Sequence, residues 1–328
     1  MSSLSQASSK NSNVSNLEIS NKVENLNKDE PQKKIGTFSS EHYNYSAYAI
    51  DRPTYNPQLV DFIIDYHLKV PGNKTKTIVD VATGTGIFAR MINKRFDRVI
   101  ATDISTKMLE KAEQASDGGA NIEYIESSAE RMPFILSNSV DIITVATGAH
   151  WFDSENFLTE VRRVLVPNGT LAIFSYNGNS EFIGAPEECG RILREFIFDI
   201  TGPYWDKGRQ ILDRMYSHYN ALVRTPGPWG TEFNDILFGI YPASAAHFVG
   251  TGFTILKSPV VINRKLTWRS FHSYVRTFSG VTNYNKAHPD RPDISISLIS
   301  RLMKTAGVSD MDAIVDINWG QSILLCRA

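Results

Sequence analysis

The stretch TIVDVATGTGIFARM, residues 77–91, decides the fold of this chain. An apolar strand pattern over 77–82 runs into a turn that contains Gly84 and Gly86, and a helical pattern follows from Gly86 to Arg95. A glycine turn between a buried parallel strand and a helix lets a ligand approach the backbone and reach the free N–H groups of the helix. The stretch therefore predicts a nucleoside ligand at the carboxyl end of the first strand.

The same alternation of strand and helix continues along the chain and predicts βαβ units with a parallel sheet. Helical patterns cover 105–116, with Ser105 as a natural N-cap, and 154–165. Five strands at this spacing predict a doubly wound α/β sheet. Beyond the first strand, the strand patterns cover 98–103, 121–127, 140–147 and 169–176.

The alternation of strand and helix patterns stops after Tyr176 and resumes only near the end of the chain. Residues 177–291 are rich in aromatics, Gly and Pro, and we expect them to form an inserted, mainly helical cap over the ligand edge of the sheet. We expect 292–328 to complete a seven-stranded, mostly parallel sheet. Helical patterns within the cap lie near 186–199, 207–223 and 267–278, and the end of the chain contains a helix at 293–307 and strands at 312–319 and 322–328.

The first 36 residues differ in composition from the rest. They are dominated by Ser, Asn, Lys and Glu, which offer too little apolar surface to offset the entropy of ordering, so we expect a disordered N-terminal tail. Residues 37–176 are then expected to be the cofactor-binding core.

Charge and cysteine content exclude several classes of protein. The chain has 34 basic and 35 acidic side chains, so no net field attracts nucleic acid or an anionic membrane. No apolar run approaches the roughly 20 residues of a membrane helix. The two cysteines are too few for a disulfide framework, and no cluster has metal-ligand spacing, so we expect no metal. We expect a cytoplasmic monomer or weak homodimer.

Two kinds of nucleoside ligand use such a glycine turn, the dinucleotides and S-adenosylmethionine. Gly84, Gly86 and Ala89 match the dinucleotide fingerprint, with Asp103 at about the distance of a ribose acceptor. However, Asp80 precedes the turn, where its charge would repel a pyrophosphate and attract an ammonium group. These residues favour S-adenosylmethionine over NAD. Ile104 and Met108 follow Asp103 and can cover an adenine ring.

Several motifs together carry a family resemblance. The runs DVATGTG, ATDIS, SSAERMPF and GAHWFD resemble the class I S-adenosylmethionine-dependent methyltransferases. More narrowly, the chain resembles the fungal trans-aconitate methyltransferase group from about residue 37 to the C-terminus. The motifs of this narrower resemblance are YAIDRPTYNPQLVDFI (48–64), AHWFD (149–153), TGPYWDKGRQIL (201–212) and FHSYVRTFSG (271–280).

The resemblance implies a role for each matching residue. His150 and Trp151 would lie near the transferable methyl group. The position of the family's first glycine is occupied by Ala82, which makes the cofactor loop slightly bulkier. The expected cofactor-binding residues are Asp80, Ala82, Gly84, Gly86, Asp103, Ile104, Met108, Ser128, Ala129 and Thr147, and the expected substrate-binding residues are Tyr48, Arg52, Tyr204, Trp205, Arg209 and Arg276.

The arginines point to a substrate with carboxylates. A carboxylate is already ionised at pH 7 and needs no base to become a nucleophile, and the planar fork of arginine matches its geometry. We therefore expect O-methylation of a small organic acid, and the resemblance implies that this acid is similar to trans-aconitate.

Other interpretations remain open from the residues alone. Each of these arginines can instead pair with a surface carboxylate, His150 can be a core histidine, and Trp151, Tyr204 and Trp205 can serve packing alone. The substrate can be another small molecule with an O-, N- or C-nucleophile. More distant alternatives are an NAD-dependent oxidoreductase, for which neither a Tyr-x-x-x-Lys pair nor a His–Asp relay is visible, and a non-catalytic interaction module.

Overall fold

The computed structural model describes residues 52–328 except 116, 207, 243–251 and 258–260. The expected tail, 1–36, and the candidate substrate residue Tyr48 lie outside the described residues.

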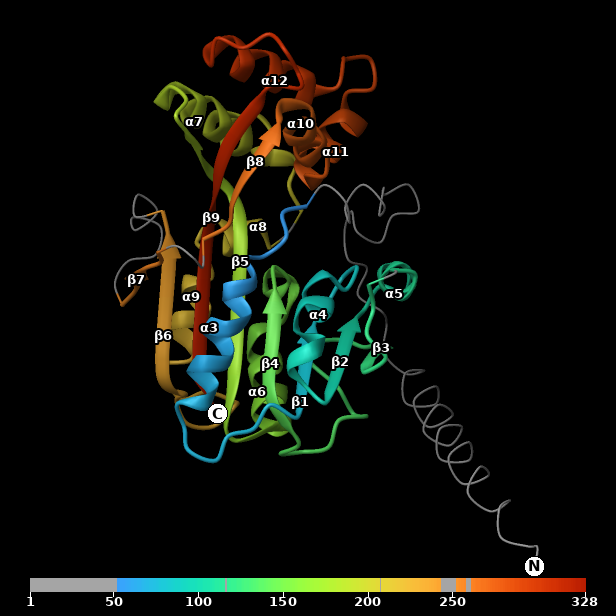
Figure 1. Cartoon of the computed structure of the whole chain (residues 1–328), viewed down its shortest axis with the longest axis vertical. Helices are drawn as coiled ribbons and strands as arrows, with labels where there is room; N and C mark the ends of the chain where they lie inside the picture. Colours follow the sequence, from blue (N-terminus) through green and yellow to red (C-terminus); the bar gives the residue numbers. More distant parts are fainter. Residues whose placement is uncertain (1–51, 116, 207, 243–251, 258–260) are drawn as a thin grey trace, which may run out of the picture. The chain divides into compact units, whose positions relative to one another are not determined.

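A twisted sheet organises the described part of the chain (Figure 1). The strand order is β3-β2-β1-β4-β5-β9-β6-β7, and β8 pairs with β9. The pairs formed by β1 to β5 are parallel, whereas β9 runs antiparallel to both β5 and β6. The prediction of a doubly wound, mostly parallel α/β sheet is confirmed. The strands are β1 Thr77–Val81, β2 Arg98–Asp103, β3 Ile122–Glu126, β4 Val140–Ala146, β5 Leu165–Ile183, β6 Asn234–Tyr241, β7 Thr254–Ile255, β8 Asn263–Thr267 and β9 Ile314–Arg327.

The expected number of seven strands is wrong for the described residues, which contain nine. The three strands that the sequence did not indicate, β6, β7 and β8, all come from the range 177–291 that we expected to form the cap. The run ILFGIY (236–241) in β6 has no polar residue at alternate positions, so it lacks the alternation of a half-exposed strand. The expected cap therefore also contributes to the sheet.

The two strands expected at 312–319 and 322–328 are one continuous strand, β9. Asn318, Trp319 and Gly320 resemble a turn in the sequence, but Gly320 pairs with Asn177 inside the ladder. The irregularity lies on the opposite side, where β5 shifts its register between Asn177 and Glu181. β9 can therefore run from the sheet into the cap without a break.

The helices begin at recognisable caps. Asn56 caps α3 by accepting a hydrogen bond from the N–H of Gln58, Ser105 caps α5 as expected, and Asp153 caps α6. No described helix is long and apolar enough to cross a membrane. The helices are α3 Pro57–Leu68, α4 Ile87–Ile92, α5 Thr106–Glu113, α6 Ser154–Val164, α7 Glu187–Arg194, α8 Arg209–Asp213, α9 Ser217–Leu222, α10 Trp268–Arg276, α11 Ser279–Ala287 and α12 Ile294–Thr305, with short 3-10 turns η2 Asn93–Arg95, η3 Ala149–Trp151 and η5 Gly202–Tyr204 and a π turn η4 Glu195–Ile200.

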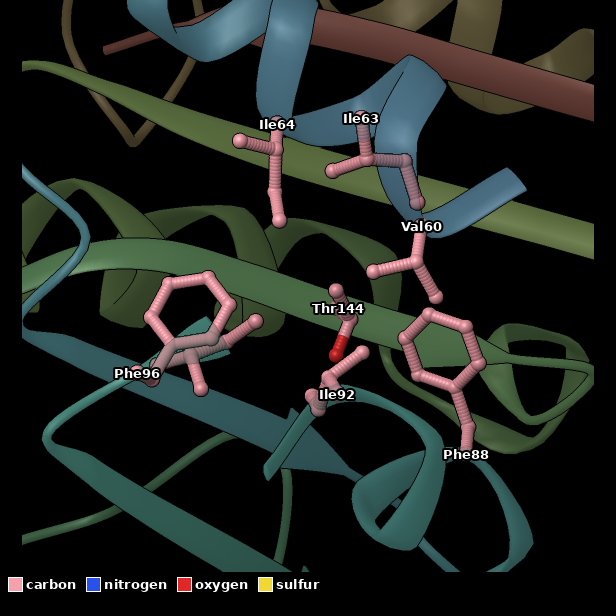
Figure 2. Close-up of a pocket in the computed structure, with 8 residues that line it drawn as sticks. Val60, Ile63, Ile64, Phe88, Ile92, Phe96 and Thr144 are labelled. Carbon is pink, nitrogen blue, oxygen red and sulfur yellow. The ribbon is translucent and has the colours of Figure 1, made fainter. Parts of the chain in front are cut away.

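Alternate residues of the strands face two separate apolar clusters. Ile78 and Ile142 pack on the side of α3 and α4, while Val79 and Ile143 pack on the side of α6. Figure 2 shows the first side, where an apolar pocket too narrow for water separates α3 from α4. Helices on both faces hold the parallel strands rigidly, so the turns at their carboxyl ends have fixed positions. The residues that line this pocket are Val60, Ile63, Ile64, Ile78, Phe88, Ile92, Phe96 and Thr144.

The segments expected to form the cap have two different locations. Helices α7, α10 and α11, together with α12 from the C-terminal part of the chain, pack around the far ends of β5, β8 and β9 (Figure 1). Helix α8 instead contacts η3, directly after β4. The single helix expected at 207–223 is two short helices, α8 and α9, separated by residues 214–216. Within this break the φ angles of Met215 and Tyr216 are 53° and 59°.

Candidate active site

The glycine turn after β1 has the shape that a ligand needs. Ala82, Gly84 and Gly86 all have positive φ, at 54°, 58° and 73°. A Cβ atom on Gly84 would meet nothing within 4 Å, so the backbone there faces open space. A Cβ atom on Gly86 would lie 2.8 Å from the hydroxyl of Tyr124, so this position has no room for a side chain. The turn fits a cofactor that lies directly against the backbone.

Asp80 is fully buried at the end of β1. Its carboxylate accepts hydrogen bonds from the hydroxyls of Thr83, at 2.6 Å, and Thr144, at 2.7 Å. Burial raises the pKa of Asp80 to about 6, although both hydrogen bonds act in the opposite direction. Asp80 thus supports the turn and offers a carboxylate to a positively charged ligand group.

Asp103 joins the end of β2 to the glycine turn. Oδ2 accepts a hydrogen bond from the N–H of Gly84 at 2.8 Å, and Oδ1 accepts one from the N–H of Ser105 at 2.9 Å. Burial raises the pKa of Asp103, while these backbone hydrogen bonds act against the rise. A carboxylate oxygen has further lone pairs, so Asp103 can also accept from ribose hydroxyls.

The remaining expected cofactor residues surround the same edge. Ile104 is half-buried and leaves apolar surface for a base, whereas Met108 is buried and offers little surface. Ser128 forms an isolated bridge with Arg131 in the turn after β3, and Ala129 is buried there. The four turns after β1 to β4 therefore meet at one edge, as the parallel pairing requires.

The turn after β4 packs against the glycine turn. A Cβ atom on Gly148 would lie 2.7 Å from the Cβ atom of Ala82. Thr147 has a φ of 57°, and its hydroxyl lies 2.6 Å from the hydroxyl of Tyr55. The segment before α3 thus covers this part of the edge. Tyr55 was not among the expected site residues, although it lies in the motif at 48–64.

His150 and Trp151 form the 3-10 turn η3 immediately after this contact. Their ring centroids are 4.9 Å apart, and Nδ1 of His150 lies 2.8 Å from the hydroxyl of Tyr216. Burial lowers the pKa of His150 to about 3, and the positive charges of Arg209 and Arg52 act in the same direction. His150 is therefore neutral at pH 7.

Arg52 and Arg209 approach His150 from separate segments. Arg52 donates a hydrogen bond to the carbonyl of Thr277 at 3.1 Å and lies 5.8 Å from the ring centroid of Tyr274. The guanidinium of Arg209 lies 3.8 Å from the ring centroid of Trp205 and pairs with Asp213, and the side chains of this ion pair are only 11% and 20% exposed. Burial lowers the pKa of Arg209, and the charge of Arg52 contributes to this shift. The two arginines, the neutral histidine and the rings form one polar and aromatic cluster.

Two expected substrate residues lie elsewhere. Arg276 is 64% exposed and forms an ion pair with Asp293, so the structure does not bring it into the cluster around His150. The hydroxyl of Tyr204 lies 2.8 Å from Nε2 of His288, and its ring packs against Tyr284. Arg276 and Tyr204 were expected at the site because their sequence motifs also contain residues of the cluster. A sequence motif does not show in which direction each side chain points.

Sequence reasoning missed Tyr216, Asp213 and Gly208. A Cβ atom on Gly208, which has a φ of 94°, would lie 2.2 Å from the carbonyl oxygen of His150, so only glycine permits this approach. The glycine in the run DKGR was the available signal for this contact. Tyr216 and Asp213 lie in a stretch that reads as one continuous helix, which hides their role.

Comparison with known proteins agrees with this geometry. Residues 79–173 match the model of a methyltransferase domain. The chain is 28% identical over 295 residues to the "Probable S-adenosylmethionine-dependent methyltransferase CRG1" of Saccharomyces cerevisiae, covering 88% of this chain and 96% of that protein. It is 32% identical over 210 residues to a Dictyostelium discoideum protein named as a methyltransferase, covering 62% of this chain and 74% of that protein. These names give the reaction but no substrate.

A solved structure supports the fold. The protein from Anaeromyxobacter dehalogenans, named as a type II methyltransferase, superimposes with a TM-score of 0.59 at 20% identity and covers 84% of this chain and 97% of its own. Residues 79–173, which match the methyltransferase-domain model, include the glycine turn, Asp103 and the turns after β1 to β4, and these residues fit S-adenosylmethionine as the cofactor. The chain therefore belongs to the class I S-adenosylmethionine-dependent methyltransferases.

Proposed function

We propose that this enzyme methylates a carboxylate of a small organic acid similar to trans-aconitate. The observation that carries the proposal is that helix α8, which begins at Arg209, contacts the turn η3 of His150, and that the charges of Arg209 and Arg52 both act on this histidine. Two arginines within an aromatic cluster provide forked donors for carboxylate oxygens and exclude water from them.

The state of His150 supports a substrate that needs no base. Methyl transfer to an amine or a phenol requires removal of a proton, and an efficient base has a pKa near the working pH. A histidine with a pKa of about 3 is a poor base at pH 7. A carboxylate is ionised at that pH without help, so it suits this site better than an amine or a phenol.

Each group then has a role that geometry explains. When bound, S-adenosylmethionine supplies an electrophilic methyl group. Arg52 and Arg209 bind the carboxylates of the acid, and Trp205 holds the guanidinium of Arg209 in one plane. His150 donates one hydrogen bond without adding charge. Such positioning of nucleophile and methyl group in line can lower the barrier by about 7–11 kcal/mol.

The charges of the described cluster also limit the substrate. Asp213 balances part of the positive charge of Arg209. Arg52 is the second arginine of the cluster. This balance supports a small acid rather than a nucleic acid or a membrane as the partner, in agreement with the near-zero net charge of the chain. A monomer or weak homodimer in the cytoplasm remains our prediction.

The test is an assay of methyl transfer with matched substrates. Purified enzyme receives S-adenosylmethionine labelled in the methyl group, with trans-aconitate, its triamide, or an amine of similar size. We expect label only in the acid, as an ester that releases methanol in base. Transfer to the amine alone, or to the triamide as readily as to the acid, would refute carboxylate methylation and favour the alternative of another nucleophile.

A further inference from the structure

Residues 208–219, which include α8 and the first residues of α9, contact η3 at three points. Gly208 lies against the carbonyl of His150, where a side chain would not fit. The hydroxyl of Tyr219 donates a hydrogen bond to the carbonyl of Ala149 at 2.9 Å. Tyr216 contacts the ring of His150 itself. Two contacts fix the backbone of the turn, and only the third reaches the imidazole.

Tyr216 is placed with unusual backbone geometry. Met215 and Tyr216 are consecutive residues with φ angles of 53° and 59°, a region that bulky side chains rarely adopt and that costs about 1–3 kcal/mol each. Tyr216 is only 1% exposed, and its ring lies nearly parallel to that of His150, with centroids 6.1 Å apart and an interplanar angle of 23°. The fold thus accepts backbone strain to bring this phenol to the histidine.

The contact between Tyr216 and Nδ1 of His150 bears on which nitrogen of the imidazole carries the proton. A neutral histidine has one N–H donor and one acceptor nitrogen, and the partner of one nitrogen sets the state of the other. Nδ1 faces the hydroxyl of Tyr216, while Nε2 makes no hydrogen bond to any described residue. A phenol is a better donor than acceptor, so the favoured arrangement is donation from Tyr216 to Nδ1.

We propose that Tyr216 is a positioning residue that holds His150 in the Nε2–H form, so that Nε2 donates a neutral hydrogen bond to an oxygen of the substrate. The proposal rests on the proposed function for the identity of that oxygen, since a carboxylate accepts such a bond. Its structural part, the position of the proton, holds independently of the substrate. The low pKa of His150 agrees with it, because the imidazole stays neutral across the physiological range.

The first test measures the tautomer directly and needs no substrate. The full chain, labelled with nitrogen-15 at histidine and saturated with S-adenosylhomocysteine, is studied by long-range proton–nitrogen correlation spectroscopy. We expect Nδ1 of His150 to be an acceptor nitrogen and Nε2 to carry the proton. Tyr216→Phe should yield a mixture of both forms or the reverse form. Tyr219→Phe, which also loses a buried phenol hydroxyl, should keep the wild-type tautomer. A proton on Nδ1 in the wild type would overturn the proposal.

The second test measures whether Tyr216 acts through His150. Methylation of trans-aconitate is compared in the wild type, Tyr216→Phe, His150→Ala and the double variant. We expect Tyr216→Phe to lower kcat/KM about tenfold in the wild-type background and to have no effect on the His150→Ala background. An equal loss in both backgrounds would mean that Tyr216 only supports the fold, and would overturn the proposal. If the wild type does not methylate trans-aconitate, the proposed substrate fails, while the tautomer measurement still decides the role of Tyr216.

Discussion

The carboxylate of Asp103, at the end of β2, accepts a hydrogen bond at 2.8 Å from the backbone N–H of Gly84, in the turn that follows β1. Gly84 faces open space and has a φ of 58°. Asp103 therefore fixes the glycine turn, and its carboxylate oxygens have further lone pairs that can accept from the hydroxyls of a ribose.

Asp103→Ala should weaken the binding of S-adenosylhomocysteine about 10- to 100-fold. The change removes hydrogen bonds to a charged acceptor, each of which contributes about 1.5–3 kcal/mol. Calorimetric titration of the purified variant measures this loss. Asp312→Ala, which removes an exposed carboxylate paired with Arg269, is the control and should bind as the wild type does. Unchanged affinity in Asp103→Ala would exclude its role as ribose acceptor.

Asp80→Asn should make the unliganded protein more stable at pH 7.5 while it binds the cofactor less well. The pKa of Asp80 rises on folding from 3.8 to about 6, so the folded state binds its proton more tightly and stability falls as the pH increases through this window. Above pH 6 the buried charge costs about 3 kcal/mol, which a neutral amide avoids. Thermal unfolding of both proteins should show a higher Tm for the variant at pH 7.5 and a smaller difference at pH 5.

The same pair of proteins tests the functional half of this prediction. The affinity of the wild type for S-adenosylhomocysteine should fall as the pH decreases below 6, because a protonated Asp80 no longer attracts the ammonium group. The variant should show a weak affinity that changes little with pH. A variant that is less stable at pH 7.5, or that binds the cofactor as tightly as the wild type, would argue that Asp80 is only a structural residue.

Gly208→Ala should reduce methyl transfer far more than Gly184→Ala. Both glycines have positive φ, at 94° and 74°, so both substitutions carry the same kind of backbone strain. Only the Cβ atom at 208 would collide with the carbonyl oxygen of His150, whereas the one at 184 meets nothing within 4 Å. We expect at least a tenfold lower kcat/KM for Gly208→Ala and a small decrease in Tm for both. Equal activities would show that the contact with His150 is not needed.

The arrangement of the expected cofactor residues was predictable because local sequence patterns determine it. The strand at 98–103 has the bounds that the sequence indicated, and Ser105 caps the next helix as expected. Asp80, Gly84, Gly86 and Asp103 meet because parallel strands end at one edge, so their chain positions alone bring them together.

The substrate half was predictable only in part. Arg52 and Arg209 do meet near His150, but Arg276 lies on the surface with Asp293. Helix α10 carries its buried residues on one face, and a difference of two or three positions decides whether a side chain enters the site. Tyr216 could not be found because its positive φ breaks a stretch that contains no Gly or Pro near the break.

The most direct test of the central claim is calorimetric titration of trans-aconitate into the enzyme saturated with S-adenosylhomocysteine. Three proteins are compared: the wild type, Arg209→Ala and Arg276→Ala. We expect binding to the wild type and to Arg276→Ala with similar affinity, and a loss of at least tenfold in Arg209→Ala, because of these two arginines Arg209 alone lies in the cluster with His150. Absence of binding to the wild type, or equal binding to all three proteins, would contradict the assignment of this cluster as a carboxylate site.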